Sequence, residues 1–101
     1  MALNLNQVFI PSEDIVARTI EGELIIVPLV AGIGDLEDEL YTLNDTGRSI
    51  WALLNGRNTL AHIVATMEQE YDAPKGQIAN DVLGLVDELS KRKILVEVLS
   101  V

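Results

Sequence analysis

The chain has 101 residues, of which 49% are hydrophobic, so it is long enough for one compact core and too short for two ordinary domains. Sixteen acidic and seven basic residues give a net charge of −9, which disfavours binding to a nucleic-acid duplex. Cysteine is absent, which excludes a disulfide framework, a thiolate metal site and a cysteine nucleophile. No segment approaches the roughly 20 apolar residues of a membrane span, and the first residues lack a signal-peptide pattern. We therefore expect a soluble, unprocessed, cytoplasmic protein.

The first part of the chain predicts a loosely structured lead-in and then a β-hairpin. Residues 1–14 show no regular pattern and end in a Pro-Ser-Glu-Asp run. Residues 15–20 and 23–29 are rich in β-branched side chains, which favour strands. Glu21-Gly22 between them is typical of a primed turn, because glycine tolerates a positive φ. We expect the hairpin to supply the first two strands of a sheet.

A short third strand is predicted at Leu40–Leu43, after an acidic, glycine-containing surface loop at residues 30–39. A strand of about four residues in this setting should lie at a sheet edge, where its outer N–H and C=O groups have no partner. Such an edge can accept a peptide as an added strand. The first candidates for a peptide-binding site are therefore Leu40, Tyr41, Thr42 and Leu43.

Three helices and a final extended segment are predicted behind this strand. Asn44 and Thr59 can cap the first two helices, because their side-chain oxygens accept free amide protons of the first turn. The third helix should run from about Lys75 to Lys91, and the aliphatic run Ile94–Val98 predicts a last strand or tail. The elements together predict an α+β, winged-helix-like domain, with a three-stranded antiparallel sheet followed by a three-helix bundle.

The third helix supplies the other candidate site residues. Its apolar stripe is wider than a one-sided surface helix needs, so its margin could line a groove while most of the stripe lies in the core. Charged side chains beside the stripe could contact charged residues of a peptide. The candidates on and just after this helix are Asp81, Val82, Leu85, Val86, Glu88, Leu89 and Arg92.

The sequence offers no catalytic constellation. His62 is the only histidine, and no recognisable motif places a nucleophile or an orienting carboxylate beside it. Gly32-Ile33-Gly34 lacks the third glycine of a dinucleotide loop, and the acidic cluster at residues 35–39 lacks the spacing of a calcium loop. We therefore expect a protein that is not an enzyme and that holds neither a cofactor nor a metal ion.

Several motifs, in their order and spacing, resemble the PqqD family. They are Leu43–Trp51, Leu54–Thr59, Ile63-Val64, Tyr71 and Asp81-Val82 through Leu89. The resemblance implies a winged-helix-like module that binds the leader of a ribosomally made precursor peptide. Such a module presents the leader to a modifying enzyme, often a radical S-adenosylmethionine protein, in pyrroloquinoline quinone biosynthesis or a related pathway. In the family the leader pairs with the third strand and lies against the last helix.

The likeness covers about residues 15–97, which defines the expected domain, with residues 98–101 as a tail. Members of the family often have glycine after the last helix, where this chain has Lys93.

Two other functions stay open from the sequence. A winged-helix regulator could read DNA with the third helix, although the outward side of that helix carries Asp81, Asp87 and Glu88 and no basic residue before Lys91. A structural adaptor would have no peptide affinity. The strand edge and the apolar tail also allow a homodimer, in which self-association and peptide binding could compete for one edge.

Overall fold

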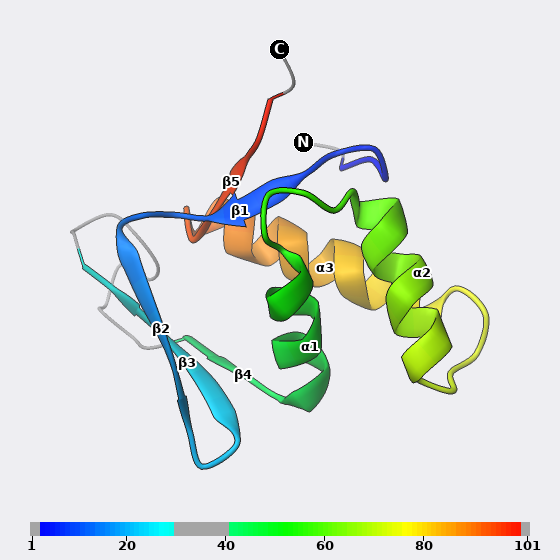
Figure 1. The fold of residues 1–101 in the computed structure, drawn as a ribbon, viewed down its shortest axis with the longest axis horizontal. Coiled ribbons are helices and arrows are strands. Elements are labelled where there is room, and N and C mark those ends of the chain that lie inside the picture. Colours follow the sequence, from blue (N-terminus) through cyan, green and yellow to red (C-terminus); the bar gives the residue numbers. More distant parts are fainter. Residues whose placement is uncertain (1–2, 30–40, 100–101) are drawn as a thin grey trace.

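The structure is a computed structural model that describes residues 3–29 and 41–99, with Tyr41 described by its backbone only. The elements of this part are β1 (Phe9–Pro11), β2 (Ile15–Ile20), β3 (Glu23–Pro28), β4 (Tyr41–Leu43), α1 (Asp45–Leu53), α2 (Leu60–Glu70), α3 (Gln77–Lys91) and β5 (Leu95–Glu97). Figure 1 shows β2, β3 and β4 on the left and the helices on the right. Within the described residues, a three-stranded antiparallel sheet and three helices confirm the predicted fold class.

The hairpin of β2 and β3 forms where the sequence predicts it. The strands are antiparallel with Ile20 opposite Glu23, and the turn between them has positive φ at Glu21 (52°) and Gly22 (83°), as a type I′ turn requires. The strand β4 pairs with β3, so the order of this sheet in the described residues is β2-β3-β4. The predicted third strand is therefore present, and it lies at an edge.

The first two helices begin at the predicted caps, whereas α3 begins at Gln77, two residues after the predicted start, without a side-chain cap. The Oδ1 atom of Asn44 accepts a hydrogen bond from the Gly47 N–H at 2.9 Å, and the Oγ1 atom of Thr59 accepts one from the His62 N–H at 3.1 Å. Each bond satisfies an amide group that the helix itself leaves free. Because Asn44 directly follows β4, its cap fixes the turn from the edge strand into α1.

The lead-in is more ordered than the sequence suggests, and this corrects the expectation for residues 1–14. Phe9–Pro11 forms β1 and pairs antiparallel with β5, and the Phe9 side chain is only 3% exposed. The partner strand lies at the other end of the chain, so no local pattern of hydrophobic residues indicates this pairing. The packed domain therefore includes residues before 15.

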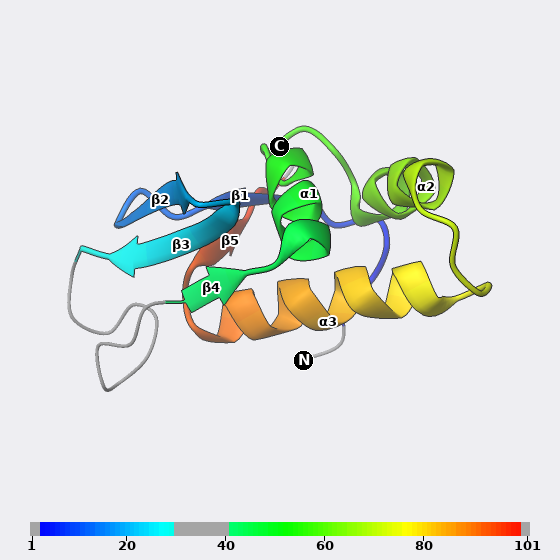
Figure 2. The same cartoon turned by 90° about the horizontal axis from the view of Figure 1, so that it is seen from below.

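The core lies where the three helices meet the inner face of the β2-β3-β4 sheet. Figure 2 shows α3 lengthwise below α1 and beside the end of β4. The side chains that are least exposed come from the sheet, the helices and the residues that follow α1 and α3: Ile26, Ile50, Leu54, Leu60, Ile63, Met67, Val82, Val86, Leu89 and Ile94. None of the helices among residues 3–29 and 41–99 has the length and apolar character needed to cross a membrane.

Candidate functional site

Along β3, residues that bond to β2 alternate with residues that bond to β4, and this alternation determines which backbone groups of the neighbouring strands face outward. The Leu29 N–H donates to the Asp14 carbonyl at 2.8 Å, so these two residues form a hydrogen-bonded pair at the end of the hairpin. Hydrogen-bonded and non-bonded pairs alternate along an antiparallel ladder. The odd-numbered residues of β3 therefore bond to β2, and the even-numbered Leu24 and Ile26 face β4.

The outer edge of β4 consequently presents the backbone of Thr42. Leu43 and Tyr41 are opposite Leu24 and Ile26, so their backbone groups bond to β3 and those of Thr42 point away from the sheet. Within residues 3–29 and 41–99, no group forms a hydrogen bond with the N–H or the C=O of Thr42. A donor and an acceptor are thus available there for an added strand.

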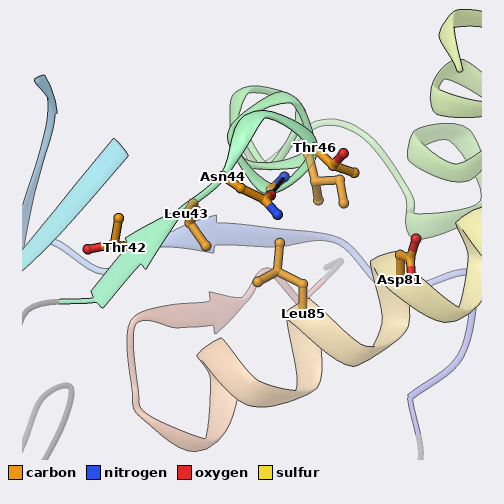
Figure 3. Close-up of a pocket in the computed structure, with 8 residues that line it drawn as sticks. Thr42, Leu43, Asn44, Thr46, Asp81 and Leu85 are labelled. Atoms are coloured by element: carbon orange, nitrogen blue, oxygen red, sulfur yellow. Dashed lines mark hydrogen bonds between the residues drawn. The ribbon is translucent and has the colours of Figure 1, made fainter. Parts of the chain in front are cut away.

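A groove lies beside this edge, between β4, the start of α1 and the middle of α3. It has a volume of about 450 Å³ and is lined by Thr42, Leu43, Asn44, Thr46, Gly47, Ile50, Asp81 and Leu85. Figure 3 shows Leu43 and Leu85 pointing toward the same space from β4 and α3, with Asp81 farther along α3. Leu43 and Ile50 are buried and Leu85 is half-buried, so the floor of the groove is apolar.

A close approach of α1 to β4 shapes this groove. Gly47 is buried in the first turn of α1, and a Cβ atom there would lie 3.2 Å from the Leu43 Cβ and 3.3 Å from its Cδ2. A larger residue would push the helix and the strand apart, because these separations are shorter than ordinary carbon contacts.

Four of the predicted residues on α3 and just after it share one stripe at helical spacing: Asp81, Leu85, Glu88 and Arg92. Asp81 is exposed. Glu88 and Arg92 bond to each other, since the Nε and Nη2 atoms of Arg92 each lie 2.9 Å from the Glu88 Oε1. The stripe therefore offers one acidic group and one internally compensated ion pair to a ligand in the groove.

Three other predicted groove residues are core residues. Val82, Val86 and Leu89 have 0% exposure, because their side of α3 faces the core that also holds Ile63 and Met67. Their proposed contact with a peptide is corrected, and of the predicted apolar residues of α3 only Leu85, at the margin of the apolar face, lines the groove.

The sequence reasoning also missed several groove residues. Asn44 and Ile50 line the groove in addition to their structural roles, and Thr46 lies between them in sequence. Their position immediately after the edge strand is the signal that could have identified them.

Other predictions fall outside the described residues. These are Leu40, the side chain of Tyr41, the Gly32-Ile33-Gly34 segment and the acidic cluster at residues 35–39. His62 is described and is exposed on α2. Within residues 3–29 and 41–99, no group of three or more His, Cys, Asp or Glu side chains could hold a metal ion.

The family model "Coenzyme PQQ synthesis protein D (PqqD)" matches residues 26–95, which include the edge strand, the groove and α3. The chain belongs to the PqqD family. This match confirms the resemblance found in the motifs.

Two individual proteins are similar to this PqqD-family chain. A "PqqA binding protein" of Gluconobacter oxydans (strain 621H) is 29% identical over 58 residues, which are 57% of this chain and 60% of that protein. The chain thus spans about 60% of the length of that relative. The solved structure "TbiB1 in Complex with the TbiA(beta) Leader Peptide" covers 90% of this chain and 99% of its own, with a TM-score of 0.71 and 20% identity. That likeness shows a shared fold.

Proposed function

We propose that this protein binds the leader of a ribosomally synthesised precursor peptide as a strand added to β4, and presents it to a modifying enzyme. The enzyme would be a radical S-adenosylmethionine protein or another peptide-modifying enzyme, in pyrroloquinoline quinone biosynthesis or a related pathway. The protein itself performs no chemical step. The observation that carries the proposal is the outward N–H and C=O of Thr42 next to a groove with an apolar floor.

Strand addition would anchor the peptide backbone and direct its side chains. A peptide residue opposite Thr42 can exchange two hydrogen bonds with it, and the side chains of the two neighbouring peptide residues then point to the inner face of the sheet. Leu43 lies on that face, and Ile50 of α1 packs beside it to complete the groove floor. Because each backbone hydrogen bond contributes only about 0.5–1.5 kcal/mol net, the peptide side chain in the groove must supply much of the affinity.

The lining of the groove favours a particular leader chemistry. Leu43, Ile50 and Leu85 suit an aliphatic or aromatic side chain, and the exposed carboxylate of Asp81 suits a basic residue farther along the peptide. The Glu88–Arg92 pair remains part of the proposed peptide path because it continues the same stripe of α3. Its two charges compensate each other at 2.9 Å, so we expect the pair to contribute less than Asp81 to selectivity for charged residues of the leader.

The similar proteins support this class of function. One relative is named for binding PqqA, and the structure with the same fold was solved with a leader peptide. The family assignment includes the whole groove. These observations support peptide recognition more directly than a particular pathway or enzyme.

The test is a calorimetric titration with the leader of a precursor peptide encoded near this protein, using two proline variants. Thr42→Pro removes the outward donor of β4, while the β3–β4 hydrogen bonds stay because Thr42 does not form them. Thr19→Pro is the matched control, since Thr19 also has its N–H outward, on β2 at the opposite edge of the sheet. We expect Thr42→Pro to weaken binding at least tenfold and Thr19→Pro to leave it unchanged.

Other outcomes would redirect the interpretation. Equal binding by both variants would show that the peptide does not use this edge, and binding lost only in Thr19→Pro would place it on β2. If the wild-type protein bound no candidate leader, a structural adaptor would be the better explanation. Presentation is tested separately, by measuring whether the modifying enzyme turns over its peptide faster when this protein is added.

A further inference from the structure

A hollow of about 250 Å³ lies between the end of α3 and the small sheet of β1 and β5, on the side of α3 away from the leader groove. Its lining comes from both ends of the chain: Leu3, Phe9, Asp87, Ser90, Lys91, Leu95 and Glu97. Phe9 and Leu95 are buried, so the floor of the hollow is apolar, whereas its rim carries charged side chains.

One polar group of this hollow has no partner. Among the buried side-chain nitrogen and oxygen atoms of residues 3–29 and 41–99, the Oγ atom of Ser90 is the one that forms no hydrogen bond. A buried hydroxyl that is left unpaired costs free energy, because it has lost water without gaining another partner. A ligand group that entered the hollow and bonded Ser90 would remove this cost.

The charges of the hollow favour a basic ligand group. The Nζ atom of Lys91 lies 3.1 Å from the Oδ2 atom of Asp87, so these two charges compensate each other. Within the described part of the chain, Glu97 forms no ion pair. One carboxylate of the rim is therefore uncompensated, and a lysine or arginine side chain would complement it.

An open strand edge lies beside the hollow. The Val98 N–H donates to the Val8 carbonyl at 2.8 Å directly after the β1–β5 ladder, so the even-numbered residues of β5 bond to β1. The backbone groups of Leu95 and Glu97 point outward, and no group within residues 3–29 and 41–99 forms a hydrogen bond with them. An unpaired edge of this kind can accept an extended peptide segment.

We propose that the β5 edge and this hollow bind an extended segment of the modifying enzyme as an added strand. The inference rests on the proposed presentation of a leader to such an enzyme. Segment residues opposite Leu95 and Glu97 place their side chains over the hollow, because directly opposite residues share one face of a sheet. The residue next to Glu97 is basic. The other has an apolar body and a polar tip, as tyrosine and tryptophan do, and bonds the Ser90 Oγ.

The segment residue between these two faces the other side of the sheet. Ile10 and Val96 are opposite each other on that side, and both are exposed. An aliphatic residue of the segment would continue this aliphatic surface. The expected segment therefore has one aliphatic residue, flanked by a polar-tipped aromatic residue and by a basic residue.

The same chemistry disfavours a second copy of this chain as the occupant. A second β5 would bring another Glu97 carboxylate to the rim, where Lys91 is already paired with Asp87. Like charges that meet in this way repel each other. A basic segment of another protein fits the uncompensated carboxylate instead.

The location of the hollow suits a partner that must bind while the leader is held. On α3, Asp81 and Leu85 of the leader groove lie on one flank of the buried stripe, and Ser90 lies on the other. The strands β4 and β5 also belong to different sheets. Enzyme and leader can therefore occupy this protein at the same time, as presentation requires.

The test measures the affinity of this protein for the peptide-modifying enzyme encoded near it, by biolayer interferometry with both proteins purified. Ser90→Ala removes the unpaired hydroxyl, Glu97→Lys reverses the uncompensated charge, and Glu97→Pro removes an outward donor without breaking the β1–β5 bonds. We expect Ser90→Ala to weaken enzyme binding about three- to tenfold, and each Glu97 variant to weaken it at least tenfold.

Stability separates a binding role of Ser90 from a structural one. Because the Ser90 Oγ has no partner within the described residues, Ser90→Ala should be at least as stable as the wild-type protein in urea denaturation. Weaker enzyme binding by an equally stable variant would therefore report a lost contact with the enzyme. A clear loss of stability would show that the hydroxyl serves the fold, and would overturn its assignment to the enzyme.

Two control variants make the test specific. Glu68→Lys makes the same charge change as Glu97→Lys at an exposed residue of α2, and Thr19→Pro removes an outward donor on β2. Both should bind the enzyme like the wild-type protein, and circular dichroism should show every variant folded. All variants should also keep the leader affinity of the wild-type protein in calorimetry.

The outcomes distinguish this inference from the proposed leader binding. Enzyme affinity that is absent in the wild-type protein, or unchanged in all three variants, would overturn the β5 site and leave leader binding at β4 unaffected. Leader affinity lost in the Glu97 variants would place the leader here instead, and a mass that rises with concentration only in the wild-type protein would place a second copy here. A wild-type protein that binds the enzyme through β5 but no leader would refute the leader proposal alone.

Discussion

Replacing Lys93 with glycine should stabilise the protein. Lys93 follows α3 and has a φ of 62°, in the left-handed region where a side chain costs about 1–2 kcal/mol. The greater conformational freedom of glycine in the unfolded chain offsets about 0.5–1 kcal/mol of this stabilisation. The net gain in the free energy of unfolding is about 0.5–1 kcal/mol, which corresponds to a Tm increase of roughly 2–8 °C for a domain of this size.

The structure indicates that the substitution leaves the end of the helix intact. The Lys93 N–H donates to the Ser90 carbonyl at 3.0 Å and the Ile94 N–H to the Leu89 carbonyl at 2.9 Å. This is the Schellman pattern, in which the left-handed residue is usually glycine. Neither bond uses the Lys93 side chain, which is exposed. The lysine therefore stands at a position where this motif favours glycine, and the substitution keeps the local backbone unchanged.

The assay is urea denaturation followed by circular dichroism, with Lys91→Gly as the matched control. Lys91 lies in the last turn of α3 and pairs with Asp87 at 3.1 Å, so glycine there should lower stability by up to about 1 kcal/mol. If Lys93→Gly were no more stable than the wild-type protein, the argument from the left-handed backbone would be refuted.

Three further predictions concern the groove. Gly47→Ala should lower the free energy of unfolding by about 1 kcal/mol in urea denaturation, because its Cβ would lie 3.2 Å from the Leu43 Cβ and the crowding outweighs the gain in helix propensity. Leu85→Ala should weaken leader binding about tenfold in calorimetry, since it removes apolar contact worth about 1–2 kcal/mol. Asp81→Asn should weaken binding of a leader with a basic residue by about two- to fivefold, and the difference should shrink at high salt.

Each of these variants has a matched control on the same protein. Gly84 on α3 has no atom within 4 Å of an added Cβ, so Gly84→Ala should raise stability by about 0.5–1 kcal/mol. Leu83→Ala removes a half-buried leucine of α3 outside the groove, and Asp72→Asn removes an exposed charge away from it. Leader affinity that fell equally in Leu85→Ala and Leu83→Ala, or in Asp81→Asn and Asp72→Asn, would argue against the groove as the binding site.

The sequence by itself determined the elements whose signals are local. Asn44 and Thr59 identify two helix starts because a capping side chain bonds an amide only a few residues away. Glu21-Gly22 identifies the hairpin because the turn geometry depends on those two residues alone. The order of these signals was also sufficient to indicate the family that the comparison confirms.

Only the tertiary structure decided which residues face the site. Local periodicity marks Val82, Leu85 and Val86 as apolar without saying that only Leu85 lies at the groove. It also cannot choose between Tyr41 and Thr42 as the outward residue of β4, since the phase of a strand is set by hydrogen bonds to its neighbour. A proline at Tyr41 would break the sheet, whereas one at Thr42 tests the edge.

The pairing of β1 with β5 was invisible in the sequence for the same reason. Its partners lie at opposite ends of the chain, and their contact depends on how the helices between them pack. Capping, turns and periodicity act over a few residues, so the sequence can specify them directly. Strand phase, burial and strand partners depend on residues brought together only when the whole core forms.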